Sequence, residues 1–159
     1  MRISTKGRYA LRLMLDLAMN GTKDNVTIKE IAERQNISVK YLEQLVSILS
    51  KAQFVKSERG PKGGYKLSMQ PEEYTAGNIL RLLEKSVAPV ACVSDNWVCE
   101  RAGRCASMIL WKKLEDAVND ILDTTTLADM VKWEIILCSQ ERQPAFDAKA
   151  LFEEGYAKK

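Results

Sequence analysis

Histidine is absent from the 159-residue chain. This absence excludes Ser-His-Asp and Cys-His catalytic pairs and any imidazole metal ligand, and it removes the commonest general base of enzymes. A Cys-x-x-Cys motif and a glycine-rich nucleotide loop are missing as well. The chain is therefore not expected to be an enzyme, and in particular not a thiol oxidoreductase.

Long apolar runs are also lacking, since no stretch approaches the roughly 18 residues that a membrane-spanning helix needs. Arg12 and Asp16 interrupt the apolar N-terminus, and no Ala-x-Ala pattern follows, so it is a poor signal peptide. We expect a cytoplasmic protein that does not bind membranes. In a reducing cytoplasm, clustered cysteines indicate metal ligands or redox groups rather than structural disulfides.

Charge is distributed unevenly along the chain. Residues 1–66 hold 13 Lys and Arg against 6 Asp and Glu, a net charge of +7. Residues 67–159 hold 11 against 15, a net charge of −4. A basic first half is typical of a protein that meets a polyanion, although chance differences between solvated faces would give the same asymmetry.

The spacing of apolar residues predicts a helix-turn-helix in the first half. Residues 6–19 carry apolar side chains at helical intervals. Thr27 and Glu30 form a capping box before a short second helix, and Ser38 begins a third. The buried stripe of the third helix is expected to consist of Leu42, Leu45, Val46 and Leu49.

A glycine-rich β-hairpin is predicted next. Residues 54–58 and 65–67 alternate like strands, and the turn between them reads RGPKGG. A helix-turn-helix followed by a hairpin is a winged helix. We assign residues 1–70 to such a DNA-binding domain.

The second half is expected to contain a cysteine loop and a long helix. Cys92, Cys99 and Cys105 lie in a polar stretch with the spacing C-x6-C-x5-C. Apolar residues then recur over about four turns, which favours packing against a partner helix. The stripe consists of Leu110, Leu114, Ala117 or Val118, and Ile121 or Leu122.

Residues 71–132 are therefore predicted to form a cluster-binding loop and a dimerisation helix, followed by a short helix that ends at Val131. Residues 133–159 are assigned to a C-terminal tail. Beyond Ser139 this tail is charged, Pro-interrupted and weakly periodic, and it is expected to be of low order. The predicted fold class is mainly α with a small β-hairpin wing: a winged helix-turn-helix plus a long dimerisation helix.

Three groups of side chains are candidates for DNA contacts. Recognition helices point their N-terminal residues toward the bases. In that region Glu suits cytosine, Gln suits adenine, and Lys and Ser suit phosphates or bases. The third helix offers Ser38, Lys40, Tyr41, Glu43 and Gln44, the hairpin tip Arg59 and Lys62, and the N-terminus Arg2, Lys6 and Arg8.

The alternative for each group is a solvated surface. That alternative is as good as DNA binding for the third helix taken alone and for the N-terminal cations, which also include Arg12. The tip favours DNA, because a polar turn needs Gly and Pro but not both Arg59 and Lys62. An Arg at such a tip suits the negative potential of the minor groove.

The chain resembles the Rrf2 family of bacterial winged-helix regulators over residues 1–132. The resemblance lies in STKGRYALRLMLDLA, in IAERQ…KYLEQL…RGPKGGY, and in the cysteine loop with LWKKLEDAVNDILDTTTLADM. The loop is typical of the IscR- and NsrR-like branch, which binds clusters. The resemblance implies a homodimer on a palindromic operator in double-stranded DNA, with the long helix as the dimer interface. It also implies DNA contacts at Glu43 and Arg59.

The three loop cysteines predict an iron–sulfur cluster, of the 2Fe-2S or 4Fe-4S type, that would be lost in aerobic preparations. Thiolates are soft ligands that select iron–sulfur clusters, Zn or Cu(I), and the spacing is not the C-x2-C of a zinc ribbon. A zinc site, a thiol switch and a loop without metal remain alternatives.

The fourth ligand that a cluster normally takes is not evident. By the resemblance, IscR-like members place a His where this chain has Met108, and NsrR-like members use a partner Asp where it has Arg8. The remaining candidates are Asp16, Glu100, Cys138 and an external small-molecule thiol. The apolar surroundings of Cys138 favour a buried, inert thiol instead.

The predicted function is therefore a DNA-binding transcription regulator that senses iron–sulfur status, redox state or nitric oxide. The alternative is a regulator of cysteine or sulfur metabolism without a cluster, or with a zinc or thiol switch.

Overall fold

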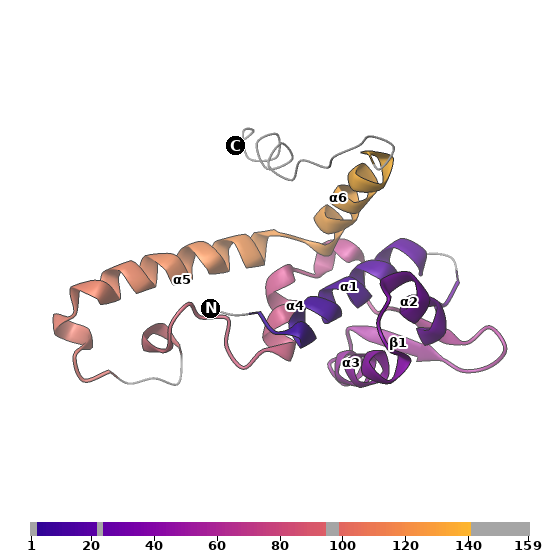
Figure 1. Cartoon of the computed structure of the whole chain (residues 1–159), viewed down its shortest axis with the longest axis horizontal. Helices are drawn as coiled ribbons and strands as arrows, with labels where there is room; N and C mark the ends of the chain where they lie inside the picture. The colour runs from indigo at the N-terminus through magenta and orange to yellow at the C-terminus, as the bar shows by residue number, and fades with distance from the viewer. Residues whose placement is uncertain (1–2, 22–23, 95–98, 141–159) are drawn as a thin grey trace.

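The computed structural model describes residues 3–21, 24–94 and 99–140. Its first part is the predicted helix-turn-helix (Figure 1). The helices are α1 (Thr5–Asn20), α2 (Ile28–Gln35) and α3 (Val39–Lys51).

Each of these helices begins at a hydroxyl side chain that caps its free backbone amides. Ser4, Thr27 and Ser38 accept hydrogen bonds from the third residue of the helix that each precedes. Thr27 and Glu30 form the predicted capping box. Asn36 ends α2 with a φ of 51°, a left-handed conformation that Asn tolerates better than most residues.

The core lies between α1, α2, α3 and the hairpin. The predicted stripe of α3 is buried throughout, as are the inward residues of α1. The largest buried side chains come from both halves of the chain: Leu13, Met14, Leu17, Ile31, Leu42, Leu45, Leu49, Tyr74, Ile79 and Leu127.

Asp16 is the one charged side chain buried in this core within the described residues, with 3% of its surface exposed. Its carboxylate accepts from Arg34 Nη2 at 2.7 Å and from Arg34 Nε at 3.0 Å. Gln35 Nε2 donates to the same carboxylate at 3.0 Å. The hydrogen bonds that Arg34 donates to Asp16 raise the pKa of Arg34. A buried charge needs such partners, so these contacts stabilise the packing of α1 against α2.

The wing is the two-stranded antiparallel sheet β1 (Val55–Glu58) and β2 (Gly64–Leu67). Tyr65 exchanges backbone hydrogen bonds with Val26, which joins the wing to the segment before α2. A Cβ at Gly64 would lie 2.7 Å from the Val26 carbonyl oxygen, so this approach requires glycine.

Tyr74 holds the base of the wing from the other side. Its hydroxyl donates to the Phe54 carbonyl at 2.7 Å and accepts from the amides of Ser68 and Met69 at 3.0 and 2.9 Å. Burial raises the pKa of Tyr74, so the hydroxyl stays protonated and keeps donating.

The second half contains three longer helices: α4 (Ala76–Leu83), α5 (Ala106–Thr124) and α6 (Leu127–Gln140). Single 3-10 turns are η1 (Pro71–Glu73), η2 (Ala91–Val93) and η3 (Ala102–Arg104). α4 packs against α1, and α5 extends away from the body to the end of the molecule opposite the wing (Figure 1). No described helix is long and apolar enough to cross a membrane.

The prediction that the last helix ends at Val131 was wrong, because α6 continues to Gln140. Apolar residues such as Trp133, Ile135 and Ile136 lie on several sides of α6, so the sequence shows no clear helical period there. The rest of the predicted tail lies outside the described residues.

Replacing Asp16 by Ala should lower the free energy of unfolding by about 2 kcal/mol. The charge of Arg34 loses its partner, although its side chain is 38% exposed and water relieves part of the loss. Urea unfolding at a fixed protein concentration measures the effect. Asp24→Ala removes the same charge from an exposed turn and should change the stability by less than about 0.5 kcal/mol. Equal effects of the two changes would contradict this account of the ion pair.

Candidate functional site

The N-terminal half of α3 presents most of the predicted recognition residues to solvent. Ser38, Lys40, Glu43 and Gln44 are exposed. Tyr41 is only half-buried, and its ring packs edge-on against Tyr9 of α1 with 5.7 Å between ring centroids. Tyr41 therefore also helps to set the position of α3 on α1.

The wing tip is a hydrogen-bonded turn that carries both predicted cations. Gly60 adopts a φ of 114°, and its carbonyl accepts from Gly63 N at 2.9 Å. Asn25 donates to Glu58 Oε2 at 2.7 Å and to the Lys62 carbonyl at 3.1 Å. Sequence reasoning missed Asn25, because this contact joins residues more than 30 positions apart.

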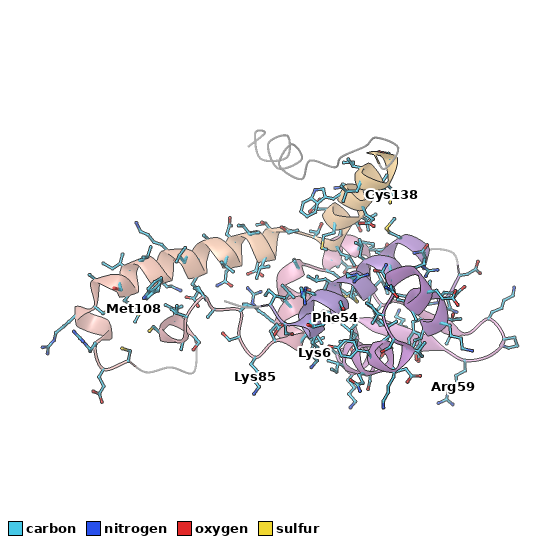
Figure 2. The ribbon with its side chains drawn as sticks, in the orientation of Figure 1. Lys6, Phe54, Arg59, Lys85, Met108 and Cys138 are labelled. Carbon is cyan, nitrogen blue, oxygen red and sulfur yellow. The ribbon has the colours of Figure 1, made fainter. Side chains whose placement is uncertain are left out.

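Arg59 and Lys62 are exposed at this tip, and Arg59 lies at the end of the molecule opposite the cysteine loop (Figure 2). Glu58, at the end of β1, forms an ion pair with Lys66. Hydrogen bonds from Lys66 and then Asn25 lower the pKa of Glu58, so its negative charge is balanced within the wing.

The N-terminal cations differ in their surroundings. Lys6 is half-buried, and Arg8 is exposed and donates to Thr5 Oγ1 at 3.1 Å. Arg2 lies outside the described residues. Arg12 has a structural role, since its guanidinium stacks 5.4 Å from the Tyr9 ring centroid and donates to Gln35 Oε1 at 3.0 Å.

The cysteine loop follows α4 and leads into α5. Cys92, Cys99 and Cys105 are free and half-buried. These thiols fit a thiophilic metal in kind. No three His, Cys, Asp or Glu residues of the described part of the chain are gathered closely enough to hold a metal ion. Donor chemistry alone therefore supports a site in the loop.

Cys105 lies at the N-cap of α5 and lines a cavity of about 590 Å³ together with Met108. The charged residues that line this cavity are Arg104, Lys112 and Lys113. Met108 thus stands beside a loop thiol, and the cavity contains no described carboxylate.

The candidate residues for a fourth ligand differ in their partners and in their exposure. Both carboxylate oxygens of Asp16 are bound to Arg34. Glu100 is exposed beside Cys99. Cys138 is exposed on α6, so the prediction of a buried thiol was wrong. The apolar residues expected to enclose Cys138 are themselves at the surface of the single chain.

The arm formed by α5 is attached to the body through α4. Arg81 binds the carboxylate of Asp123, and its Nη2 donates to Asn119 Oδ1 at 2.8 Å. The contacts to Asp123 raise the pKa of Arg81. Along the arm no described residue is buried, and a stripe of large apolar side chains faces solvent: Ile109, Leu110, Leu114 and Ile121.

Comparison with known proteins agrees with this architecture. The Rrf2 family, described as iron-dependent transcriptional regulators, matches residues 3–133. The regulator CymR of Bacillus subtilis is 44% identical over 84% of this chain and 91% of its own length. The regulator IscR of Sodalis glossinidius is 40% identical over 90% of this chain and 86% of its own.

Solved structures give the same result. The structure of B. subtilis CymR, described as its global cysteine regulator, matches with a TM-score of 0.72 and 44% identity, covering 84% of this chain and 98% of CymR. IscR of T. potens matches with a TM-score of 0.67 and 36% identity, covering 92% of this chain and 94% of IscR. The mainly helical winged-helix fold is thereby confirmed.

These relatives are transcription regulators and not enzymes. This finding agrees with the prediction that the present chain, which lacks histidine and enzyme motifs, is not an enzyme. The family match covers the winged helix, the cysteine loop and α5 together. The chain therefore belongs to the Rrf2 family of DNA-binding transcription regulators.

Proposed function

We propose that the protein is a cytoplasmic, homodimeric regulator that binds a palindromic operator and senses iron–sulfur status, redox state or nitric oxide through its cysteine loop. The observation that carries the proposal is that the candidate DNA-contact residues and the cysteines lie toward opposite ends of the molecule. An exposed polar helix face and a cationic wing tip lie toward one end, and three half-buried thiols lie toward the other (Figures 1 and 2).

DNA binding is proposed for residues 1–70. Glu43 and Gln44 of α3 are exposed at the end of the helix that would face the bases. Lys40, Ser38 and the N-terminal cations would contact phosphates. Arg59 would reach the minor groove, because it is exposed at the wing tip and its guanidinium has no described carboxylate partner.

Dimerisation is proposed for α5. Leu110, Leu114, Ala117 and Ile121 are exposed and follow one another at steps of four, three and four, which is the seam of a two-helix packing. A second copy of the same helix would cover this stripe. The two α3 helices of such a dimer must lie about one turn of DNA, ~34 Å, apart.

The sensing step is proposed for Cys92, Cys99 and Cys105. Their thiolates would hold an iron–sulfur cluster, whose gain, loss or reaction with oxidant or nitric oxide supplies the signal. The signal would reach the start of α5 through the chain itself, because Cys105 directly precedes the first residue of that helix. A fourth ligand from outside the described chain, such as a small-molecule thiol, would complete the set.

A regulator of cysteine metabolism without a cluster is the second candidate. CymR, the global cysteine regulator, is 44% identical to this chain. The described thiols are not gathered into a ligand set, which also favours this alternative. The two functions differ in whether the loop thiols bind iron.

Anaerobic purification should yield coloured protein that contains iron and acid-labile sulfide. Replacing Cys92, Cys99 and Cys105 by Ala should remove the colour and the response of DNA binding to oxidant or nitric oxide. Cys138→Ala is the control, and it should change neither property, because Cys138 lies on α6 far from Met108 and the loop (Figure 2). Colourless protein after anaerobic cluster reconstitution, with an unchanged response in the triple variant, would favour the CymR-like alternative.

The two classes of DNA contact should respond differently to substitution. Glu43→Ala should change the preferred base at one position of each half-site, by about 1–3 kcal/mol of discrimination. Arg59→Ala should weaken binding to all sequences and reduce the salt dependence of the affinity, since it removes a cation near the phosphates. Binding to a pool of randomised operators at several salt concentrations measures both. If neither change has an effect, the proposed DNA interface is wrong.

Leu110→Glu together with Leu114→Glu should convert the protein to monomers, because like charges would face one another in the seam. Light scattering should then give the mass of a single chain. Asp116→Ala, on another face of α5, should leave the dimer intact. A double variant that remains dimeric would move the interface away from α5.

A further inference from the structure

We infer that Glu84 positions the first turn of α1 for phosphate contacts and connects that turn to the segment that carries Cys92. This inference rests on the proposed DNA binding for its effect on affinity. The structural contact on which it is built does not depend on that proposal.

The contact joins residues that are 80 positions apart. Glu84 is the C-cap of α4 and is half-buried. Its Oε1 accepts from Ser4 N at 2.9 Å and from Ser4 Oγ at 2.7 Å. Ser4 Oγ in turn accepts from Gly7 N at 3.2 Å, and the Ser4 carbonyl accepts from Arg8 N at 3.1 Å. One carboxylate oxygen therefore holds Ser4, the N-cap residue of α1.

The packing around Gly7 is matched to this carboxylate. A Cβ at position 7 would lie 2.3 Å from Glu84 Oε1 and 3.0 Å from Leu80 Cδ2. Any other residue there would push Glu84 out of its place. A negative charge is also favourable beside the unpaired amides at the start of a helix. The site thus fits a side chain with an accepting oxygen at position 84 and glycine at position 7.

The first turn that Glu84 secures carries Lys6 and Arg8, two of the proposed phosphate contacts. Without its cap the first turn of a helix frays, and its side chains are no longer held in fixed positions. Glu84 is therefore a positioning residue for DNA binding, although its own charge repels phosphate.

Glu84 is also the first residue of the segment that leads to the cysteine loop. Arg81, one turn earlier in α4, binds Asp123 of α5. Between these contacts lies a cavity of about 550 Å³, bounded by residues 84–88, Ser94 and α5. Lys85, next to Glu84, lies below and to the left of Lys6 in Figure 2, where the segment leaves the body. A displacement of this segment that moved Glu84 would thus reach the DNA-facing end of α1 directly.

The sign of the effect of Glu84→Ala on affinity tests the inference. Coulomb repulsion alone predicts tighter DNA binding when the carboxylate is removed. Positioning predicts the opposite, an affinity about fivefold to tenfold weaker. The slope of log affinity against log salt should also fall by about one unit for each phosphate that the first turn of α1 no longer binds. Operator binding across a range of salt concentrations gives both quantities.

Two variants serve as controls. Glu84→Gln keeps an oxygen that accepts from Ser4 and should bind DNA within about twofold of the wild type. Glu72→Ala removes the same charge from an exposed position on η1 and should not weaken binding. The inference is supported if Glu84→Ala weakens DNA binding and the two control variants do not. Tighter binding, an unchanged salt slope, or equal effects of the Ala and Gln changes would overturn it.

Hydrogen exchange separates this inference from the proposed function. In Glu84→Ala the amides of Gly7 and Arg8 should exchange at least several-fold faster, whereas amides in the core of α3 should not change. If the wild type shows no salt-dependent DNA binding, the proposed function fails, and the exchange measurement still decides whether Glu84 holds α1. Unchanged exchange at Gly7 and Arg8 would reject the role of Glu84.

Discussion

The buried carboxylate of Asp16 fixes how the helices of the winged helix meet. It binds Arg34 and Gln35, at the end of α2, from the middle of α1. Gln35 also accepts from Arg12, whose guanidinium stacks on Tyr9. Tyr9 then packs against a tyrosine of α3. Because a buried carboxylate is stable only with its partners in place, this chain of contacts links Asp16 to the position of α3 on α1.

Tyr74 has a comparable role where the wing, α4 and α6 meet. Its hydroxyl is bound to three backbone groups at the base of the wing. Its carbonyl accepts from the amide of Leu127, the first residue of α6, at 2.8 Å. Two residues later, the amide of Ala76 donates to the Thr125 carbonyl at 2.9 Å, at the root of the arm. The wing and the arm are thus attached to the same short segment, although they extend toward opposite ends of the molecule (Figure 1).

Local signals in the sequence predicted the parts of the structure that depend on neighbouring residues. The capping box of Thr27 and Glu30 and the stripe of α3 are of this kind, since both follow from helical geometry. The contact of Glu84 with Ser4 could not be predicted, because a side-chain contact across 80 residues leaves no periodic pattern. Asp16 was considered as a metal ligand for the same reason, since its partner Arg34 is identified only by the fold.

The length of α6 and the exposure of Cys138 were predicted wrongly because α6 carries apolar side chains that are exposed on the surface of the single chain. Periodicity is informative when a helix has one apolar face and one polar face. α6 is apolar on several sides, so its pattern resembles a buried strand or an irregular segment. The loop thiols pose a related difficulty. Their number and spacing are visible in the sequence, but whether they come together depends on the three-dimensional fold, and among the described residues they are not gathered into a ligand set.

The length of α5 has a mechanical consequence. Its 19 residues span roughly 28 Å, from the cysteine loop to the turn before α6. Arg81 holds the arm at Asp123, close to that turn, so the arm is a lever with a short side and a long side. A shift of about 2 Å at the loop would tilt such a lever by only about 4°. Chemistry that pushes only weakly at the loop would therefore act with mechanical advantage on the joint between the arm and the DNA-binding domain.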